Sequence, residues 1–98
     1  SNTAGDYKID FNISCRTAAA GDAGTYQFRL YVNGTEGSGD QALGCTKQFT
    51  GTTDTDVLSF TGICTFSSLD VLTIYVESDA GSGDDLTIYD MAFTAVLL

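Results

Sequence analysis

The stretch Gly24-Thr-Tyr-Gln-Phe-Arg-Leu-Tyr-Val-Asn-Gly34 indicates the fold class of the whole chain. From Tyr26 to Val32, large apolar residues occupy every second position, and Gln, Arg or Tyr lies between them. This period of two is typical of a β-strand with one face buried and the other face in water. The closing Asn-Gly pair tolerates positive φ and ends a strand in a tight turn. We therefore expect a half-buried strand at residues 24–32.

The same period recurs on both sides of this stretch and breaks at three places. Lys47 interrupts an apolar row, which suits a strand at the edge of a sheet. Gly62 indicates a bulge or a close approach of another segment, and a change of parity near Tyr89 and Asp90 predicts a bulge. We expect the last strand to run centrally in a sheet. The five further strands are expected at residues 6–15, 43–50, 57–66, 71–77 and 86–98.

The connections between these segments are rich in Gly, Asp, Ser and Thr. Asn33-Gly34 is typical of a two-residue hairpin turn, but no strand pattern follows at once, so we expect it to open a longer loop. Six strands without a helix pattern or an internal repeat predict an all-β protein. The expected fold is a single domain over residues 1–98, a compact antiparallel β-sandwich of six to eight strands.

Composition excludes several classes of protein. The 98 residues carry 13 acidic and 4 basic side chains, a net charge of −9, and such a surface repels nucleic acid. A hydrophobic content of 43% argues against a disordered chain. Since no run of 18 apolar residues occurs, we expect no membrane insertion.

The residues needed for catalysis are sparse. Without His, neither a Ser/His/Asp nor a Cys/His arrangement can form. Asp84-Asp85 and Asp54-Thr-Asp56 are carboxylate pairs, but acids in turns are usually solvated residues that bond their own backbone. We therefore expect a protein that is not an enzyme.

A calcium ion is the one candidate cofactor. Asp79, Asp84 and Asp85, joined by Gly81 and Gly83, are candidate ligands because calcium prefers oxygen donors on a flexible loop. The spacing matches no EF-hand, and a solvated acidic loop is the alternative interpretation.

The three cysteines have no metal-binding spacing. Cys15, Cys45 and Cys64 are interpreted as small buried apolar residues. A disulfide between Cys45 and Cys64 is the alternative.

Several large apolar residues lie at the parity opposite to the expected core. A lone sandwich would leave many of them in water, more than a monomer usually exposes. Either shifts of parity at bulges cover them or the chain associates with itself. They are Tyr31, Val57, Ile63, Val71, Tyr75, Tyr89, Val96 and Leu98.

Three segments resemble small TNF/C1q-like jelly-roll domains of bacteriophage fibre heads and other virion surface proteins. The run from Tyr26 to Gly34 resembles the family's Y-x-F-x-L-x-V-N-G strand. Leu69 and Asp70 match its L-x-x-G-D-x-V corner, without the Gly, and the end of the chain resembles its C-terminal F-x-x-x-L-L strand. The resemblance implies a jelly-roll-like sandwich and a homotrimer packed around a threefold axis. The candidate interface residues are then Tyr31, Tyr75, Tyr89, Val96 and Leu98.

The same resemblance implies a place on the virion surface. The first hypothesis is a capsid decoration or cement protein that binds the major capsid protein. The second is the receptor-binding head of a tail fibre, which recognises a glycan or protein on a cell surface. A secreted carbohydrate-binding module is a third hypothesis, disfavoured by the absence of Trp. Ser1 fits either a complete small protein after removal of the initiator Met or a fragment.

An acidic decoration protein needs an uncharged means of attachment. Like charges repel within the Debye length of about 8–10 Å, so acidic loops are poor adhesives on an acidic shell. The uncharged N-terminal arm is the expected capsid-attachment segment, and an ordinary frayed terminus is the alternative. The arm comprises Ser1, Asn2, Thr3, Ala4 and Gly5.

Overall fold

The computed structural model describes residues 3–17, 24–49, 55–78 and 86–98. Strands make up 78% of these residues and none of them forms an α-helix, which confirms the predicted all-β class. No helix among them is long and apolar enough to cross a bilayer. The elements are β1 (Gly5–Thr17), β2 (Gly24–Val32), β3 (Thr35–Glu36), the short 3-10 helix η2 (Gly39–Gln41), β4 (Gly44–Phe49), β5 (Thr55–Phe66), β6 (Leu72–Ser78) and β7 (Leu86–Leu97).

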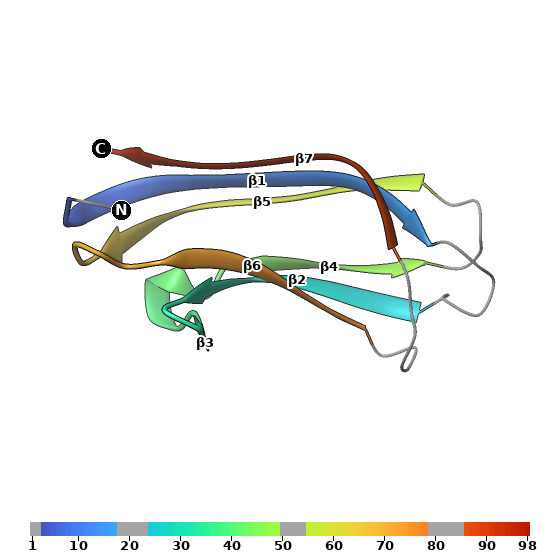
Figure 1. Ribbon diagram of the computed structural model, residues 1–98, viewed down its shortest axis with the longest axis horizontal. Coiled ribbons are helices and arrows are strands. Elements are labelled where there is room, and N and C mark those ends of the chain that lie inside the picture. Colours follow the sequence, from blue (N-terminus) through green and yellow to red (C-terminus); the bar gives the residue numbers. More distant parts are fainter. Residues whose placement is uncertain (1–2, 18–23, 50–54, 79–85) are drawn as a thin grey trace.

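The strands form two antiparallel sheets that pack face to face (Figure 1). Sheet A has the order β5-β1-β7, so β1 is paired along both of its sides. In sheet B, β2 is central, and β6, β4 and β3 all pair with it. β4 pairs with residues 24–29 of β2, and β3 pairs with Tyr31 and Val32. The chain passes between the sheets after β1, β4, β5 and β6. The predicted compact antiparallel sandwich of six to eight strands is therefore confirmed.

The inward faces of the two central strands form the core. Alternate residues of β1 from Tyr7 to Cys15 are buried, as are Tyr26, Phe28 and Leu30 of β2. The ring of Phe11 lies at the middle, with its centroid 5.1 Å from that of Phe60 and 6.1 Å from that of Phe28. Each large side chain buried in this way contributes about 1.5–3 kcal/mol to folding. The alternation read from the sequence therefore identifies the core faces of both strands correctly.

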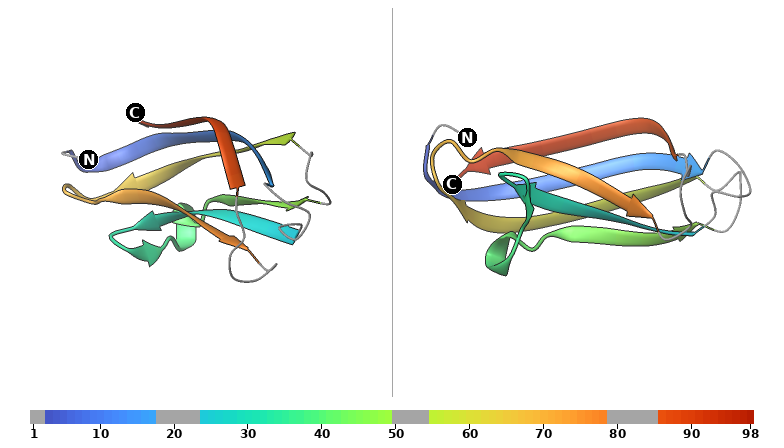
Figure 2. Two further views of the ribbon diagram at one scale, coloured as in Figure 1. Left: turned by 45° about the vertical axis from the view of Figure 1, so that its right-hand side comes forward. Right: turned by 60° about the horizontal axis from the view of Figure 1, so that its bottom comes forward.

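The bulge expected near Tyr89 and Asp90 is confirmed. Asp90 lies opposite Ser14 and Ile88 lies opposite Cys15, so Tyr89 is the extra residue of β7. One inserted residue reverses the parity of a strand and increases its local bend. Figure 2 shows β7 bending near its start, where it leaves the level of β1.

Two expectations about strands are wrong. Asn33 and Gly34 do not open a long loop: with φ values of 54° and 82°, they form a two-residue turn that joins β2 to β3. β3 has only two residues, which is too short for a sequence pattern. The last strand, β7, is not central: among the described strands it pairs with β1 alone and forms an edge of sheet A. Periodicity reports the buried face of a strand but not its place in a sheet.

The β2–β3 turn is tied to the corner between β5 and β6. The Asn33 side chain donates a hydrogen bond to Asp70 Oδ1 at 2.9 Å, and its own Oδ1 accepts one from Val71 N at 2.8 Å. Asp70 Oδ2 also accepts a bond from Ser67 N at 2.8 Å. The bonds from Asn33 and from Ser67 N lower the pKa of Asp70. This corner fixes the start of β6 beside the end of β2.

The side of the sandwich formed by β4, β5 and η2, named here the closed flank, is filled. The Leu43 side chain packs onto Gly62, where a Cβ atom would lie only 2.6 Å from Leu43 Cδ2. Gly62 therefore marks a close approach, while the register of β5 runs through it unbroken. Nearby, Lys47 Nζ lies 2.9 Å from Asp56 Oδ2, which joins the two edge strands. The expected edge position of Lys47 is confirmed, because β2 is the one described strand with which β4 pairs.

η2 covers the free edge of β5 with hydrogen bonds. Asp40 Oδ2 accepts a bond from Thr65 N at 3.0 Å, and Gln41 Nε2 donates one to Thr65 O at 2.7 Å. At Thr65, the backbone groups of this edge are therefore occupied and unavailable for pairing with a second chain.

Candidate functional site

The opposite side of the sandwich, between the edges of β6 and β7, is named here the open flank. It contains an apolar groove of about 300 Å³ that reaches inward to the two central strands. The floor of the groove consists of Phe11, Ile13 and Phe28, all of them buried core residues. The core is therefore reached from solvent on this side, in contrast to the closed flank.

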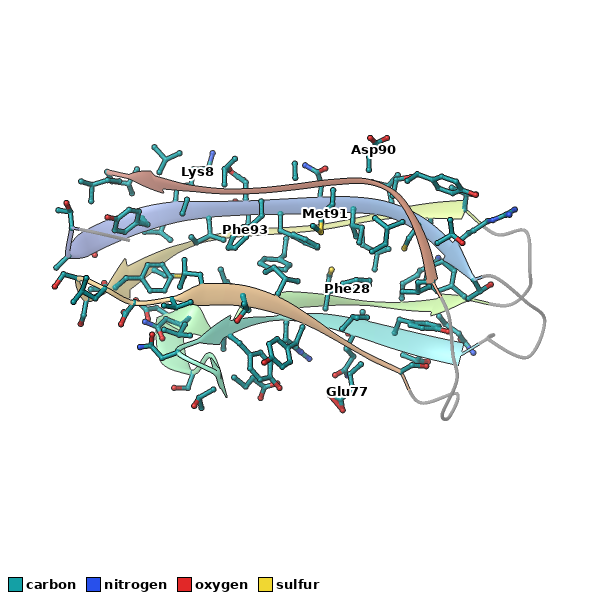
Figure 3. The ribbon with its side chains drawn as sticks, in the orientation of Figure 1. Lys8, Phe28, Glu77, Asp90, Met91 and Phe93 are labelled. Carbon is teal, nitrogen blue, oxygen red and sulfur yellow. The ribbon has the colours of Figure 1, made fainter. Side chains whose placement is uncertain are left out.

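The walls of the groove are apolar side chains of the two edge strands. Leu72, Ile74 and Val76 come from β6, and Ile88, Met91 and Phe93 come from β7. Figure 3 shows Met91 and Phe93 pointing from β7 toward Phe28, into the space between the sheets. Val76, Ile88 and Met91 are nevertheless 53%, 53% and 60% exposed, because none of the described strands covers this side. Large inward-facing apolar residues left in water mark an interaction surface.

The charges beside the open flank are acidic. Asp90 of β7 points away from the sandwich on the outer side of sheet A, and Glu77 of β6 points away on the outer side of sheet B (Figure 3). Neither β6 nor β7 contains a Lys or Arg residue. The groove is thus an apolar strip between two acidic margins.

The outer face of sheet A carries a second apolar surface, named here the Lys8 row. Lys8 of β1 lies between Ile63 of β5 and Val96 of β7, its cross-strand neighbours. Ile63 is 60% exposed and Val96 is 55% exposed. Lys8 Nζ lies 3.8 Å from Asp10 Oδ2, a distance typical of a weak surface ion pair. This row is a cation set between two exposed apolar side chains.

The outer face of sheet B carries a pair of stacked tyrosines. The rings of Tyr31 on β2 and Tyr75 on β6 are nearly parallel, with an interplanar angle of 4° and a centroid separation of 4.1 Å. Arg29 is the cross-strand neighbour of Tyr75. A hollow of about 230 Å³ farther along the same two strands is lined by Gln27 and Glu77, among others, but by neither tyrosine. Aromatic rings next to planar polar side chains are suited to binding polar ligands such as sugars.

The structure separates the residues predicted to form one interface. It brings Tyr31 and Tyr75 together on sheet B but places Val96 on the outer face of sheet A, at the opposite side of the sandwich. Tyr89 is exposed at the bulge, and the Leu98 side chain is exposed although its backbone N donates to Asp6 O. Sequence reasoning missed the groove, because the period of two at the end of the chain predicts that Met91 and Phe93 point inward but does not show that the flank they face is open.

The other predicted sites are only partly described. Asp79, Asp84 and Asp85 lie outside the described residues, as do Ser1 and Asn2. Thr3 and Ala4 are exposed, and Thr3 O accepts a hydrogen bond from the Tyr7 hydroxyl. Gly5 is already the first residue of β1, so an arm able to lie on another protein would end at Ala4. Within the described part, no group of three or more His, Cys, Asp or Glu side chains could hold a metal ion.

All three cysteines are free thiols, and the alternative disulfide between Cys45 and Cys64 is not formed. Cys15 and Cys64 are buried, and Cys64 Sγ donates a hydrogen bond to Asp40 O. Burial raises the pKa of each thiol. Thiols of this kind remain protonated at neutral pH and are poor nucleophiles. The interpretation of the cysteines as small apolar residues fits Cys15 and Cys64 fully and the half-buried Cys45 in part.

Compared with known proteins, the chain matches no family model, no curated protein and no solved structure. The resemblance of its strands to TNF/C1q-like domains therefore stays a prediction.

Proposed function

We propose that this chain is a non-enzymatic structural protein of a virion surface, a capsid decoration protein that works as a homotrimer. The observation that carries the proposal is the open flank. A sandwich that leaves Met91, Ile88 and Val76 in water, beside two strand edges that pair with no described strand, is best covered by a protein partner. Cyclic self-association covers such a surface on every copy at once.

Charge and chemistry support a binding role. A net charge of −9 disfavours nucleic acid as the partner. With no His in the chain and with buried thiols of raised pKa, the groups that usually serve as base and nucleophile are missing or unreactive. The resemblance of the strand at residues 26–34 to virion surface domains supplies the proposed location.

The proposed trimer is tested by analytical ultracentrifugation at micromolar concentration. We expect a species of three times the chain mass of 10.3 kDa. A monomer over the whole concentration range would refute self-association. Mass spectrometry of purified virus particles that encode this chain tests the location, and we expect it in many copies, in stoichiometric ratio to the major capsid protein.

The N-terminal arm is the proposed point of attachment to the major capsid protein. Its residues carry no charged side chain, so they avoid the repulsion that the acidic surface would meet at an acidic shell. Deleting residues 1–4 should preserve the circular dichroism spectrum and the trimer but abolish binding to particles that lack the protein. Equal binding by the truncated chain would contradict this attachment.

A second candidate function is the receptor-binding head of a tail fibre. It is favoured by the Tyr31–Tyr75 stack, with Arg29 beside it and Gln27 farther along β2, a surface suited to a glycan. A glycan array distinguishes the two functions. A fibre head should bind defined glycans, and its Tyr75→Ala variant should no longer bind them. A decoration protein should bind no glycan. The parent gene gives an independent answer, because a fibre head would follow an upstream repetitive or coiled stalk.

A further inference from the structure

We propose that the open flank of one copy packs onto the Lys8 row of the next copy, and that three such contacts close a ring. The proposal rests on the proposed homotrimer and names the two surfaces that meet in it. One surface is the groove edged by Val76, Ile88 and Met91. The other is the outer face of sheet A around Lys8, Ile63 and Val96.

The first argument is that each copy exposes two different apolar surfaces. The groove lies at the side of the sandwich, and the Lys8 row lies on the outer face of sheet A. A single foreign partner seated in the groove would leave Ile63 and Val96 in water. In a ring, each copy presents one surface to the copy before it and the other surface to the copy after it. The heterologous contact therefore covers both surfaces with a single kind of interface.

The second argument is the distribution of charge. If two copies met groove to groove, Glu77 and Asp90 of both would be brought together, and no Lys or Arg on β6 or β7 would offset them. Like charges brought together in this way oppose association. If the groove meets the Lys8 row, an ammonium group approaches the acidic margins instead. The two carboxylates that flank Lys8 on this face, Asp6 and Asp10, each accept a hydrogen bond from a Thr hydroxyl of β5.

Lys8 is the cation best placed for this contact. Lys47 is held by Asp56 on the closed flank, and Arg29 lies on the outer face of sheet B. Arg16 lies at the other end of β1, opposite Thr55 and Thr87, away from Ile63 and Val96. The carboxylate of Asp10 close to Lys8 accepts a hydrogen bond from the Thr61 hydroxyl at 2.8 Å. Asp10 is thus already bonded to β5, and its ion pair with Lys8 is long. A carboxylate from a second copy can therefore replace solvent around the ammonium group.

The proposal is tested with one variant for each surface. Met91→Glu places a charge in the groove, and Ile63→Glu places a charge in the Lys8 row. Both positions are 60% exposed, so the monomer should fold, and circular dichroism checks this. Val57→Glu is the matched control, because Val57 lies on the same face of β5, 67% exposed, but far from Lys8 and opposite Ser14.

We expect Met91→Glu and Ile63→Glu each to sediment as a monomer and Val57→Glu to remain a trimer. An equimolar mixture of the two monomeric variants should form a dimer and nothing larger, since the pair retains one intact groove and one intact Lys8 row. Lys8→Glu should weaken the trimer at least tenfold, and adding Glu77→Lys with Asp90→Lys should restore it.

The outcomes separate this contact from the proposed trimer itself. If the wild-type chain is a monomer, the proposed trimer fails and the contact with it, and the groove belongs to another partner. If the wild type is a trimer but Ile63→Glu is also a trimer, the trimer stands and the proposed contact is wrong. A mixture that stays monomeric would likewise overturn the heterologous arrangement.

Discussion

The two flanks of this sandwich differ although they are built from similar strands. On the closed flank, Leu43 packs onto Gly62, η2 bonds the edge of β5, and Lys47 pairs with Asp56. On the open flank, the edges of β6 and β7 belong to different sheets and line a groove that leads to Phe28, and no described segment covers it. The connection between β2 and β4 supplies both η2 and Leu43, whereas no described segment of the chain does the same for β6 and β7. Closure of a small sandwich therefore depends on its connections as much as on its strands.

The comparison also indicates where stability and where binding reside. Side chains of the closed flank are covered within one chain, so truncating them should lower the free energy of unfolding. Side chains of the open flank are only partly covered, so truncating them should mainly weaken the association between copies. Substitutions of similar size on the two flanks separate these effects.

The largest expected effect is at Phe28, which both flanks share. Its buried ring packs on Phe11, lies opposite Cys45 of the closed flank in register, and forms part of the groove floor. Phe28→Ala should lower the free energy of unfolding by about 3–5 kcal/mol, measured by urea denaturation, because a large buried ring leaves a cavity. A loss below about 1 kcal/mol would show that Phe28 is not a core residue.

The next effect compares an aliphatic truncation on each flank. Leu58 of β5 is buried, so Leu58→Ala should cost about 2–5 kcal/mol of folding stability. Met91 of β7 is largely exposed, so Met91→Ala should cost less than about 1 kcal/mol when the chain is held dilute enough to be a monomer. The same Met91→Ala variant should dissociate at a higher concentration than the wild type. Equal losses of folding stability in the two variants would mean that the flanks do not differ.

Much of the fold could be predicted because the relevant information is local. The alternation in β1 and β2 identifies Ile9, Phe11 and Leu30 as inward residues, and the parity change near Tyr89 identifies the bulge. Gly62 likewise indicates either a bulge or a close approach, and the structure shows the close approach, by Leu43, which the sequence does not identify. The alternation of apolar residues and the position of a glycine depend on the local backbone, so the sequence alone indicates them.

The candidate site could not be predicted because it depends on the order of strands in space. Met91 and Phe93 have the pattern of core residues, and both do point inward, but only the position of β7 at an edge leaves them beside a groove. The stack of Tyr31 on Tyr75 similarly requires the register of β6 against β2. A period of two in the sequence indicates neither which strand lies at the edge of a sheet nor the register between two strands.

The smallest expected effect is a pH dependence on the closed flank. The hydrogen bond from Lys47 lowers the pKa of Asp56, and a bond from Val57 N at 2.9 Å acts in the same direction. Because the pKa is lower in the folded chain than in the unfolded chain, this carboxylate stabilises the fold above its unfolded pKa. That contribution is lost as the pH falls through the folded pKa. Acid should therefore loosen the link between β4 and β5.

Urea denaturation of the wild type, Asp56→Asn, Lys47→Met and the double variant, between pH 7 and pH 2, tests this link. Each single variant should lose less stability on acidification than the wild type, because either change removes the charged pair. The double variant should resemble the single variants, because Asp56 and Lys47 act as one unit. Asp70 keeps its bonds to Asn33 and Ser67 in all four proteins, so a shared residual loss at low pH is expected from that corner. A pH profile identical in all four proteins would show that the ion pair does not close this flank.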